Sequence, residues 1–138
     1  MVFQKELRCR TNGHGDMLDL TGDVGKIVEH AGVRTGLAHV FVLGSTAAVS
    51  TIEFEPGLRK DLPRLLDALM PPSTGHGHEQ TWHDGNGHSH LQATLLGPSL
   101  TVPVRDGSPV LGTWQQIVFI ECDIIARDRT VVVTVIGE

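Results

Sequence analysis

The side chains best suited to chemistry are concentrated between His76 and His90. This stretch reads His-Gly-His-Glu-Gln-Thr-Trp-His-Asp-Gly-Asn-Gly-His-Ser-His and holds five of the eight histidines of the chain. Neutral imidazole is the commonest protein ligand for zinc and related divalent metals. The glycines between these histidines are untypical of a core element and favour a loop. We therefore predict a divalent-metal site in a loop. The alternative is a solvated loop without function, because His-rich tracts can also bind metal without purpose.

Two of these histidines, His88 and His90, stand two residues apart. On a helix such residues point to nearly opposite sides, so both reach one ion only from an extended or frayed backbone. His78 would then have to approach from the preceding loop. The isolated histidines His14 and His30 lie outside the stretch and are expected to take no part in metal binding.

Composition and charge exclude several classes of function. The chain has 138 residues, 40% of them hydrophobic, which is enough for one domain over residues 1–138 with its own core. Its formal net charge is −5 and its basic residues are scattered, so we expect no nucleic acid partner. No apolar run approaches the roughly 18 residues of a membrane span, and the first residues lack the apolar core of a signal peptide. A cytoplasmic protein that does not enter a membrane is the expectation.

Hydrophobic spacing predicts eight strands and two to three helices. The strands are expected at residues 3–10, 17–20, 36–43, 47–54, 100–104, 108–111, 115–122 and 129–136. The helices are expected at residues 21–32, 58–69 and 86–97, with Thr21, Asp61 and Asn86 as N-caps and Pro63 in the turn after Asp61. The last of these helices would hold His88 and His90 in its first turn.

These elements alternate without the regular strand-helix-strand period of a doubly wound sheet, which predicts an α+β fold with mostly antiparallel sheet. We expect residues 17–20 to return as the hairpin partner of the first strand, and residues 47–54 to pair with 36–43. The run 36–43 shows little alternation, as in a strand covered on both faces. Such excess apolar surface favours a homo-oligomer. Cys9 and Cys122 are expected to be free thiols.

The residues Gly44, Ser45 and Thr46 separate two strand-like runs. Their hydroxyls and backbone amides suit a small anion, and the alternative is a simple tight turn. His39, inside the preceding run, is interpreted as a core or interface residue, with a functional role as the alternative.

Several short motifs, taken together, resemble those of one family. They are Ser45-Thr46-Ala47-Ala48, Asp61-Leu62, Asp84-Gly-Asn-Gly-His-Ser-His-Leu91, Leu96-Gly-Pro-Ser99, Val102-Pro103-Val104 and Leu111-Gly-Thr-Trp-Gln115, followed by Glu121 and the basic pair Arg127 and Arg129. Their order and spacing resemble the YjbQ family, small proteins known as secondary thiamine-phosphate synthases, along nearly the whole chain. The resemblance implies an α+β fold with a β-sandwich, a trimer whose sheets pack around the threefold axis, and a polar pocket near the subunit boundary. It also implies an activity that joins a hydroxymethylpyrimidine diphosphate to a thiazole phosphate with loss of pyrophosphate.

The sequence departs from the family pattern at two places. Gly44 and Ile52 stand where most members carry a histidine and an asparagine, and His88 stands where most carry a small residue or proline. If positions 44 and 88 face one pocket, His88 replaces the missing ligand. The resemblance then implies a three-imidazole zinc site of His78, His88 and His90, with His83 in reserve. A mechanism that used the missing histidine or asparagine would not transfer.

Three interpretations of function follow. In the first, the chain is an enzyme for a small phosphorylated molecule: a divalent cation polarises a phosphate or diphosphate, and the remaining side chains orient its oxygens or assist proton transfer. We expect orientation from Ser45, Thr46, Arg127 and Arg129, and proton transfer from Glu53 or Asp84. In the second, the same pocket belongs to a non-catalytic trimer that binds a metal or small anion. In the third, Trp114, Gln115 and the glycines are structural and fill an inter-subunit core.

Overall fold

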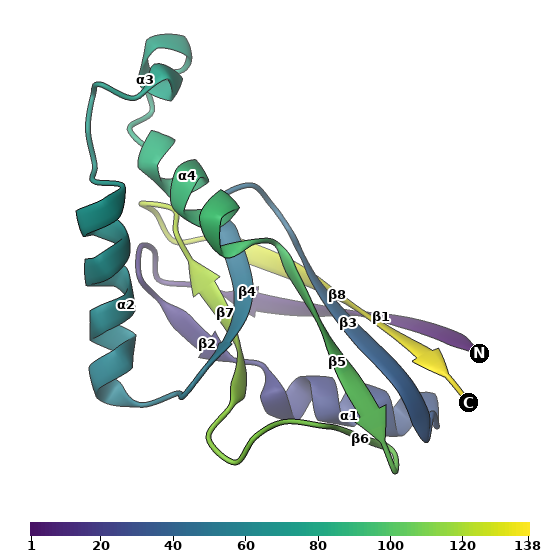
Figure 1. Cartoon of the computed structure of the whole chain (residues 1–138). Coiled ribbons are helices and arrows are strands. Elements are labelled where there is room, and N and C mark those ends of the chain that lie inside the picture. Colours follow the sequence, from purple (N-terminus) through teal and green to yellow (C-terminus); the bar gives the residue numbers. More distant parts are fainter.

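A computed structural model describes all 138 residues. Eight strands and four helices follow one another along the chain (Figure 1). They are β1 (Val2–Arg10), β2 (Met17–Asp19), α1 (Thr21–Ala31), β3 (Thr35–Leu43), β4 (Ala47–Ile52), α2 (Pro56–Leu69), α3 (Gly77–Thr81), α4 (Gly87–Leu96), β5 (Ser99–Arg105), β6 (Ser108–Pro109), β7 (Gln116–Glu121) and β8 (Asp128–Gly137). None of the helices has the length and apolar character needed to cross a bilayer.

The strands form two antiparallel sheets. One sheet has five strands in the order β1-β8-β3-β5-β6, and the other has three in the order β2-β7-β4. The predicted α+β fold with mostly antiparallel sheet is therefore confirmed. One face of the five-stranded sheet packs on α1 and on the three-stranded sheet, and the far side of the three-stranded sheet lies under α2 and α4 (Figure 1).

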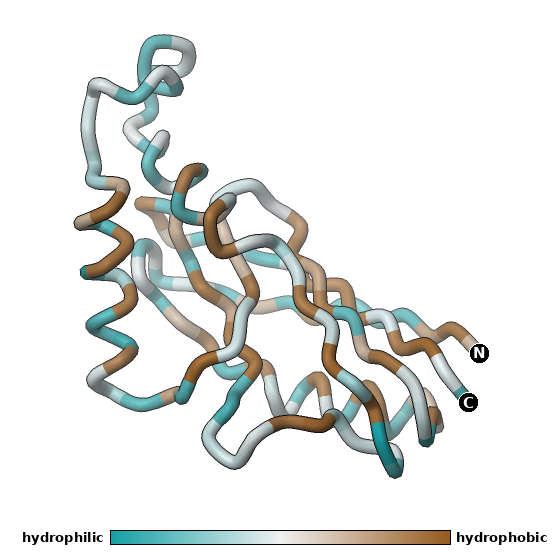
Figure 2. Tube along the Cα trace, viewed as in Figure 1, coloured by the Kyte–Doolittle hydropathy of each residue, from teal (hydrophilic) through white to brown (hydrophobic).

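Two apolar clusters fill the spaces between these layers. The larger one joins alternate residues of β8, Val131, Val133 and Val135, to Val24 and Val28 of α1. The smaller one lies below α2 and α4 and includes Met17, Val118, Ile120, Cys122 and Ala93. Hydrophobic colour follows the strands in Figure 2, whereas the segment around α3 is largely hydrophilic. The His-rich stretch is therefore outside both cores.

Two predicted strand pairings are wrong. β2 pairs with β7 and not with β1, and β4 also pairs with β7 and not with β3. The reason is that β8, rich in valine, pairs with β1 over its full length and with most of β3, a longer ladder than the three-residue β2 offers. Long ladders between buried faces outweigh the closeness of two strands along the chain. β3 is also covered on one face only, since Leu37 and Leu43 are each 48% exposed in the single chain.

The helix ends also differ from the predictions. The hydroxyl of Thr21 accepts a hydrogen bond from Ile117 N at 2.9 Å instead of capping α1. α2 begins earlier than expected, because the carboxylate of Glu55 accepts from the amides of Gly57 and Leu58, so Asp61 is not a cap. Pro63 therefore lies inside a continuous helix.

A further helix, α3, lies inside the stretch that was predicted to be a loop. Hydrophobic spacing could not predict α3, because its five residues carry no repeating apolar pattern. Its buried residue is Glu79, whose side chain is a carboxylate. Both cysteines are free, as predicted. Burial raises the pKa of the Cys122 thiol to about 12, as expected of an inert core side chain.

Candidate metal centre

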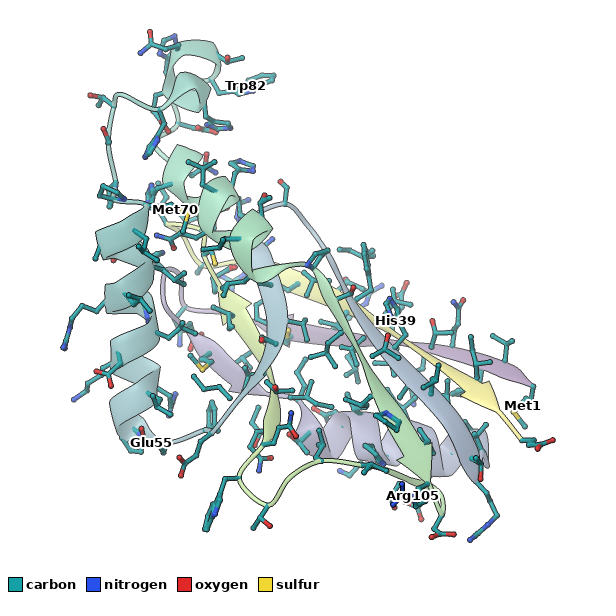
Figure 3. The ribbon with its side chains drawn as sticks, in the orientation of Figure 1. Met1, His39, Glu55, Met70, Trp82 and Arg105 are labelled. Atoms are coloured by element: carbon teal, nitrogen blue, oxygen red, sulfur yellow. The ribbon has the colours of Figure 1, made fainter.

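The candidate centre is built where α3 turns back into α4. His83 and Gly85 adopt left-handed backbone conformations, with φ of 58° and 76°, and so reverse the chain between the two helices. In Figure 3, Trp82 projects from the outer end of this segment, and its side chain is 70% exposed. The turn brings side chains of α3 beside the first turn of α4.

Glu79 fixes the two helices to each other. It is only 7% exposed, and its Oε1 accepts a hydrogen bond from Gly87 N, at the start of α4, at 2.7 Å. A carboxylate is favoured at a helix N-terminus, where backbone N–H groups lack partners. This hydrogen bond holds the pKa of Glu79 below its ordinary value, although burial opposes the shift. The second oxygen, Oε2, is buried without a partner.

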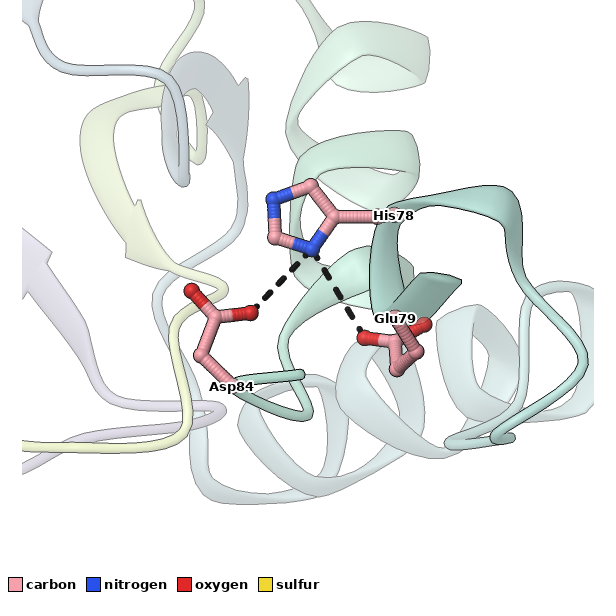
Figure 4. Close-up of side chains that lie close together, drawn as sticks. All are labelled: His78, Glu79 and Asp84. Carbon is pink, nitrogen blue, oxygen red and sulfur yellow. Dashed lines mark ion pairs between the residues drawn. The ribbon is translucent and has the colours of Figure 1, made fainter. Parts of the chain in front are cut away.

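His78, Glu79 and Asp84 form a group of ligand atoms (Figure 4). His78 Nδ1 lies 3.2 Å from Asp84 Oδ1 and 3.7 Å from Glu79 Oε1, and the three ligand atoms lie within 4.8 Å of one another. The ring of His90 lies beside that of His78, with 4.5 Å between the ring centroids. Imidazoles together with carboxylates are a donor set found in catalytic zinc sites. The residues present therefore fit a divalent cation.

Asn86 supports this group from below. One orientation of its side-chain amide gives a single contact of 3.4 Å to Asp123, and the other lets the nitrogen donate to Asp84 at 2.8 and 3.3 Å. We assign the second orientation, because the first would point the amide oxygen at the carboxylate of Asp84. Asn86 stands at the N-cap position as predicted, but its side chain makes no capping hydrogen bond.

His88 is separated from His90 by the helix itself. Residues two apart on a regular α-helix are rotated by about 200°, so the two side chains leave α4 on nearly opposite sides. His88 is 2% exposed and its ring meets the edge of His14, at 5.7 Å between centroids. Burial, followed by the neighbouring His14, holds the pKa of His88 below its ordinary value. The expected set of His78, His88 and His90 is thus divided into two histidine pairs.

The second pair belongs to a partly buried polar cluster between α2 and α4. His14 Nε2 lies 2.7 Å from Asp67 Oδ1, and its Nδ1 lies 3.1 Å from the carbonyl oxygen of Cys122. Gln92 donates to the same oxygen of Asp67 at 2.9 Å and to the carbonyl of Met70 at 3.1 Å. His14, expected to take no part, is therefore the direct neighbour of His88.

The residues expected to orient phosphate have different surroundings. Arg129 is 8% exposed and donates to Glu121 Oε2 at 2.6 Å and to the hydroxyl of Thr46 at 2.8 Å. Thr46 in turn donates to Asp123 at 2.9 Å, and Arg127 lies 2.9 Å from the same carboxylate oxygen. These interactions make a framework beneath α4. The side chain of Arg127 remains 42% exposed.

Ser45 and Glu53 lie at opposite ends of β4. Ser45 is exposed, and its hydroxyl makes no hydrogen bond within the chain. Glu53 follows the strand at its other end, close to Glu55, which Figure 3 shows at the opposite end of the molecule from Trp82. At about 3.3 Å per residue, the eight residue steps from position 45 to position 53 span roughly 26 Å. Glu53 and Asp84 were both expected to assist proton transfer. Within one chain, only Asp84 lies in the candidate centre.

The fold and the site define a class of protein. It is an α+β protein with two antiparallel sheets and a histidine–carboxylate group at one end. Residues 5–138 match the family described as UPF0047 protein YjbQ-like, and the chain belongs to this family. A UPF0047 protein of Methanothermobacter thermautotrophicus is 40% identical over 99% of this chain and 94% of its own length.

Solved structures show the same fold. A YbjQ-like protein of unknown function from Sulfolobus solfataricus superposes with a TM-score of 0.93 and 34% identity, covering 100% of this chain and 99% of that one. A hypothetical protein from Aeropyrum pernix superposes with a TM-score of 0.90 and 36% identity, over 99% of both chains. These likenesses establish the family and the fold, and they assign no activity.

Proposed function

We propose that this chain is a divalent-metal-dependent enzyme acting on small phosphate- or diphosphate-bearing molecules, with a thiamine-phosphate-synthase-like transfer as its activity. The observation that carries the proposal is the group formed by His78, Glu79 and Asp84, whose ligand atoms lie within 4.8 Å of one another. Zinc is the first candidate, because the neighbouring His90 supplies a second imidazole.

The unpartnered oxygen of Glu79 supports this proposal. Native proteins pair nearly all of their buried polar atoms, yet four buried side-chain atoms here have no partner: Glu79 Oε2, His88 Nδ1, Ser89 Oγ and Gln92 Oε1. Only Glu79 Oε2 among them belongs to a carboxylate, and the other oxygen of that carboxylate faces His78. A divalent cation bound by both oxygens of Glu79 would satisfy Oε2 and would polarise a phosphate oxygen. In this arrangement Glu79 and His78 act as ligands, His90 completes the set, and Asp84, which is 51% exposed at its side chain, either binds the ion or accepts a proton from the substrate.

Metal analysis of the purified protein tests the proposal. We expect about one zinc ion per chain after dialysis, and the loss of most of it in Glu79→Gln, which keeps the shape of the side chain and removes its charge. His30→Ala, in α1, is the matched control and should keep the metal. Equal metal content in both variants would contradict the assignment of Glu79.

A non-catalytic protein that binds a metal or small anion is the second candidate. The observation that favours it is that Arg127 and Arg129 both pair with carboxylates of their own chain and so lose much of their attraction for phosphate. Turnover separates the candidates. The zinc-loaded protein should release pyrophosphate from a hydroxymethylpyrimidine diphosphate and a thiazole phosphate if it is the enzyme, and should bind without product if it is the module.

We further propose a homotrimer in the cytoplasm. The outer face of the five-stranded sheet carries Leu37, Phe41 and Leu43, which are 48%, 38% and 48% exposed, and Trp114 is 72% exposed. Exposed apolar side chains gathered on one sheet face are typical of subunit interfaces. Light scattering should give three times the chain mass, and a stable monomer at micromolar concentration would refute the trimer.

A further inference from the structure

The turn from Gly44 to Thr46 has three consecutive backbone N–H groups without a hydrogen-bond acceptor. None of the amides of Gly44, Ser45 and Thr46 donates to a backbone or side-chain group of the protein. The hydroxyl of Ser45 is also without a partner. Successive unengaged amides in a turn are a recurrent way of binding an anion, because their dipoles add at one point. The turn is therefore a source of donors that the protein itself does not use.

A cavity of about 320 Å³ lies between this turn and α4. Gly44 and Ser45 line one side of it, and His90 and Thr94 of α4 line the other. Its remaining lining residues are the short side chains of Ala47, Ala93 and Pro98. Because His90 also lies against His78, the cavity adjoins the candidate metal centre through a single side chain. A volume of this size is at the small end of the range for ligand sites.

The framework under the turn places one unused donor of Arg129 beside it. Gly44 has a φ of 146°, and a Cβ at this position would lie 2.7 Å from Arg129 Nη1. Arg129 uses its Nε and Nη2 for Glu121 and Thr46, and its Nη1 donates to no protein acceptor. A guanidinium nitrogen without a partner thus lies directly next to the turn whose amides are free.

We propose that the Gly44–Thr46 turn is a phosphoryl-binding subsite and that the cavity beside it admits only a small organic group. The ligand class is a phosphate or diphosphate monoester whose organic part is no larger than about one ring, since the cavity is at the small end of the usual range. The backbone amides and the Ser45 hydroxyl hold the phosphate oxygens. Thr46 and Arg129 act as positioning residues that hold the turn. As a substrate subsite the inference rests on the proposed function, but its anion binding does not require the metal.

Inorganic phosphate is the probe for the first test. Protein labelled with ¹⁵N and stripped of metal with EDTA is titrated at constant ionic strength, with sodium chloride as the reference titration. We expect the amide resonances of Gly44, Ser45 and Thr46 to shift saturably with phosphate and not with chloride. If residues elsewhere shift and these three do not, the turn is not the subsite. Because metal is absent, this result is independent of the fate of the proposed metal centre.

A matched pair of variants on α4 gives the second test. Thr94→Glu places a carboxylate at the cavity, and Leu95→Glu places the same charge on the next residue, which is 63% exposed and lines no part of the cavity. Like-charge repulsion at short range should weaken phosphate binding about tenfold in the first variant and less than about twofold in the second. Thr94→Lys, with the opposite charge, should strengthen binding.

Equal weakening by Thr94→Glu and Leu95→Glu would show diffuse repulsion and would overturn the subsite. The size limit is tested with phenyl phosphate and a nucleoside monophosphate. Phenyl phosphate should bind at least as tightly as inorganic phosphate, and the nucleotide should bind more weakly. Tighter binding of the nucleotide would refute the proposed ligand class.

Discussion

The two sides of α4 carry the same kinds of side chain in opposite states. On one side His78 and His90 lie beside two carboxylates, those of Glu79 and Asp84, and the Asp84 side chain is 51% exposed. On the other side His14 and His88 lie beside one carboxylate, that of Asp67, which already accepts from His14 and Gln92, and both His88 and Gln92 are buried. We call the first side open and the second side sealed. Histidine count alone therefore does not locate a metal site, since each side of α4 has two imidazoles. The open pair differs from the sealed pair in having two carboxylates beside it, of which Glu79 has a buried oxygen without a partner.

The largest expected effect is a difference in zinc affinity between alanine variants of the two histidines of α4. His90→Ala should lower zinc affinity by roughly a hundredfold or more, because changes in the outer shell of a metal site alone cost 10–100-fold. His88→Ala should leave zinc affinity within about threefold, since it lies on the sealed side. Competition with a chromogenic chelator measures both values. A comparable loss in the two variants would restore the three-imidazole site that the sequence predicted.

A substitution on the sealed side should change the free energy of unfolding and not the zinc affinity. His14→Ala leaves the carboxylate of Asp67 with Gln92 as its hydrogen-bonding partner and should lower the free energy of unfolding by about 1–3 kcal/mol. Its zinc affinity should not change. Urea denaturation of the metal-free protein, followed by circular dichroism, gives the free energy. Unchanged stability together with weakened zinc binding would place His14 in the metal centre.

Asn86 should show an intermediate effect on the open side. Its amide donates to Asp84, so Asn86→Ala should weaken zinc binding about tenfold by releasing that carboxylate. The loss of stability should be below the roughly 1 kcal/mol of a true N-cap, because the side chain makes no capping hydrogen bond. Chelator competition and urea denaturation on the same preparation measure both quantities. A stability loss of the full N-cap size with unchanged zinc affinity would reverse the assignment.

The smallest effect is the pH dependence due to His88. Burial lowers the pKa of His88 in the folded chain, so the unfolded chain binds more protons once the pH falls toward the usual imidazole pKa of about 6.5. The free energy of unfolding of the metal-free protein should therefore decrease as pH falls below this value, down to the lowered pKa of the folded state. His88→Gln should reduce this slope. An identical slope in the variant would assign the dependence to other groups.

Much of the fold was predictable, because it depends on local pattern. The alternating valines of β8 and the helical spacing of Val24, Ile27 and Val28 located these elements to within a residue or two. Strand pairing was not predictable, because β2 and β4 both meet β7, which lies about 70 residues or more further along the chain. Local signals such as a glycine-rich turn favour a hairpin and carry no information about such a partner.

The candidate centre was predictable in part. His78, His90 and Asp84 were singled out because they belong to one dense stretch of sequence. Glu79 was missed, although a carboxylate among histidines is itself a ligand signal, because the metal ligands were expected to be the histidines of a loop and no helix was expected there to bury a carboxylate. His14 had no signal, because only the tertiary fold brings residues 14 and 88 together.

The close approach of Arg129 to Gly44 also restricts which side chains this turn can accept. A side chain at position 44 would place its Cβ 2.7 Å from Arg129 Nη1, on a backbone with a φ of 146°. Gly44→His would therefore disturb the ion pair of Arg129 with Glu121 before it could supply a ligand. Arg129 Nη1 is the far end of a long side chain, so the guanidinium has to shift before position 44 can hold a side chain. Gly44→His is thus expected to act first on the packing of Arg129 and only then on the candidate metal centre.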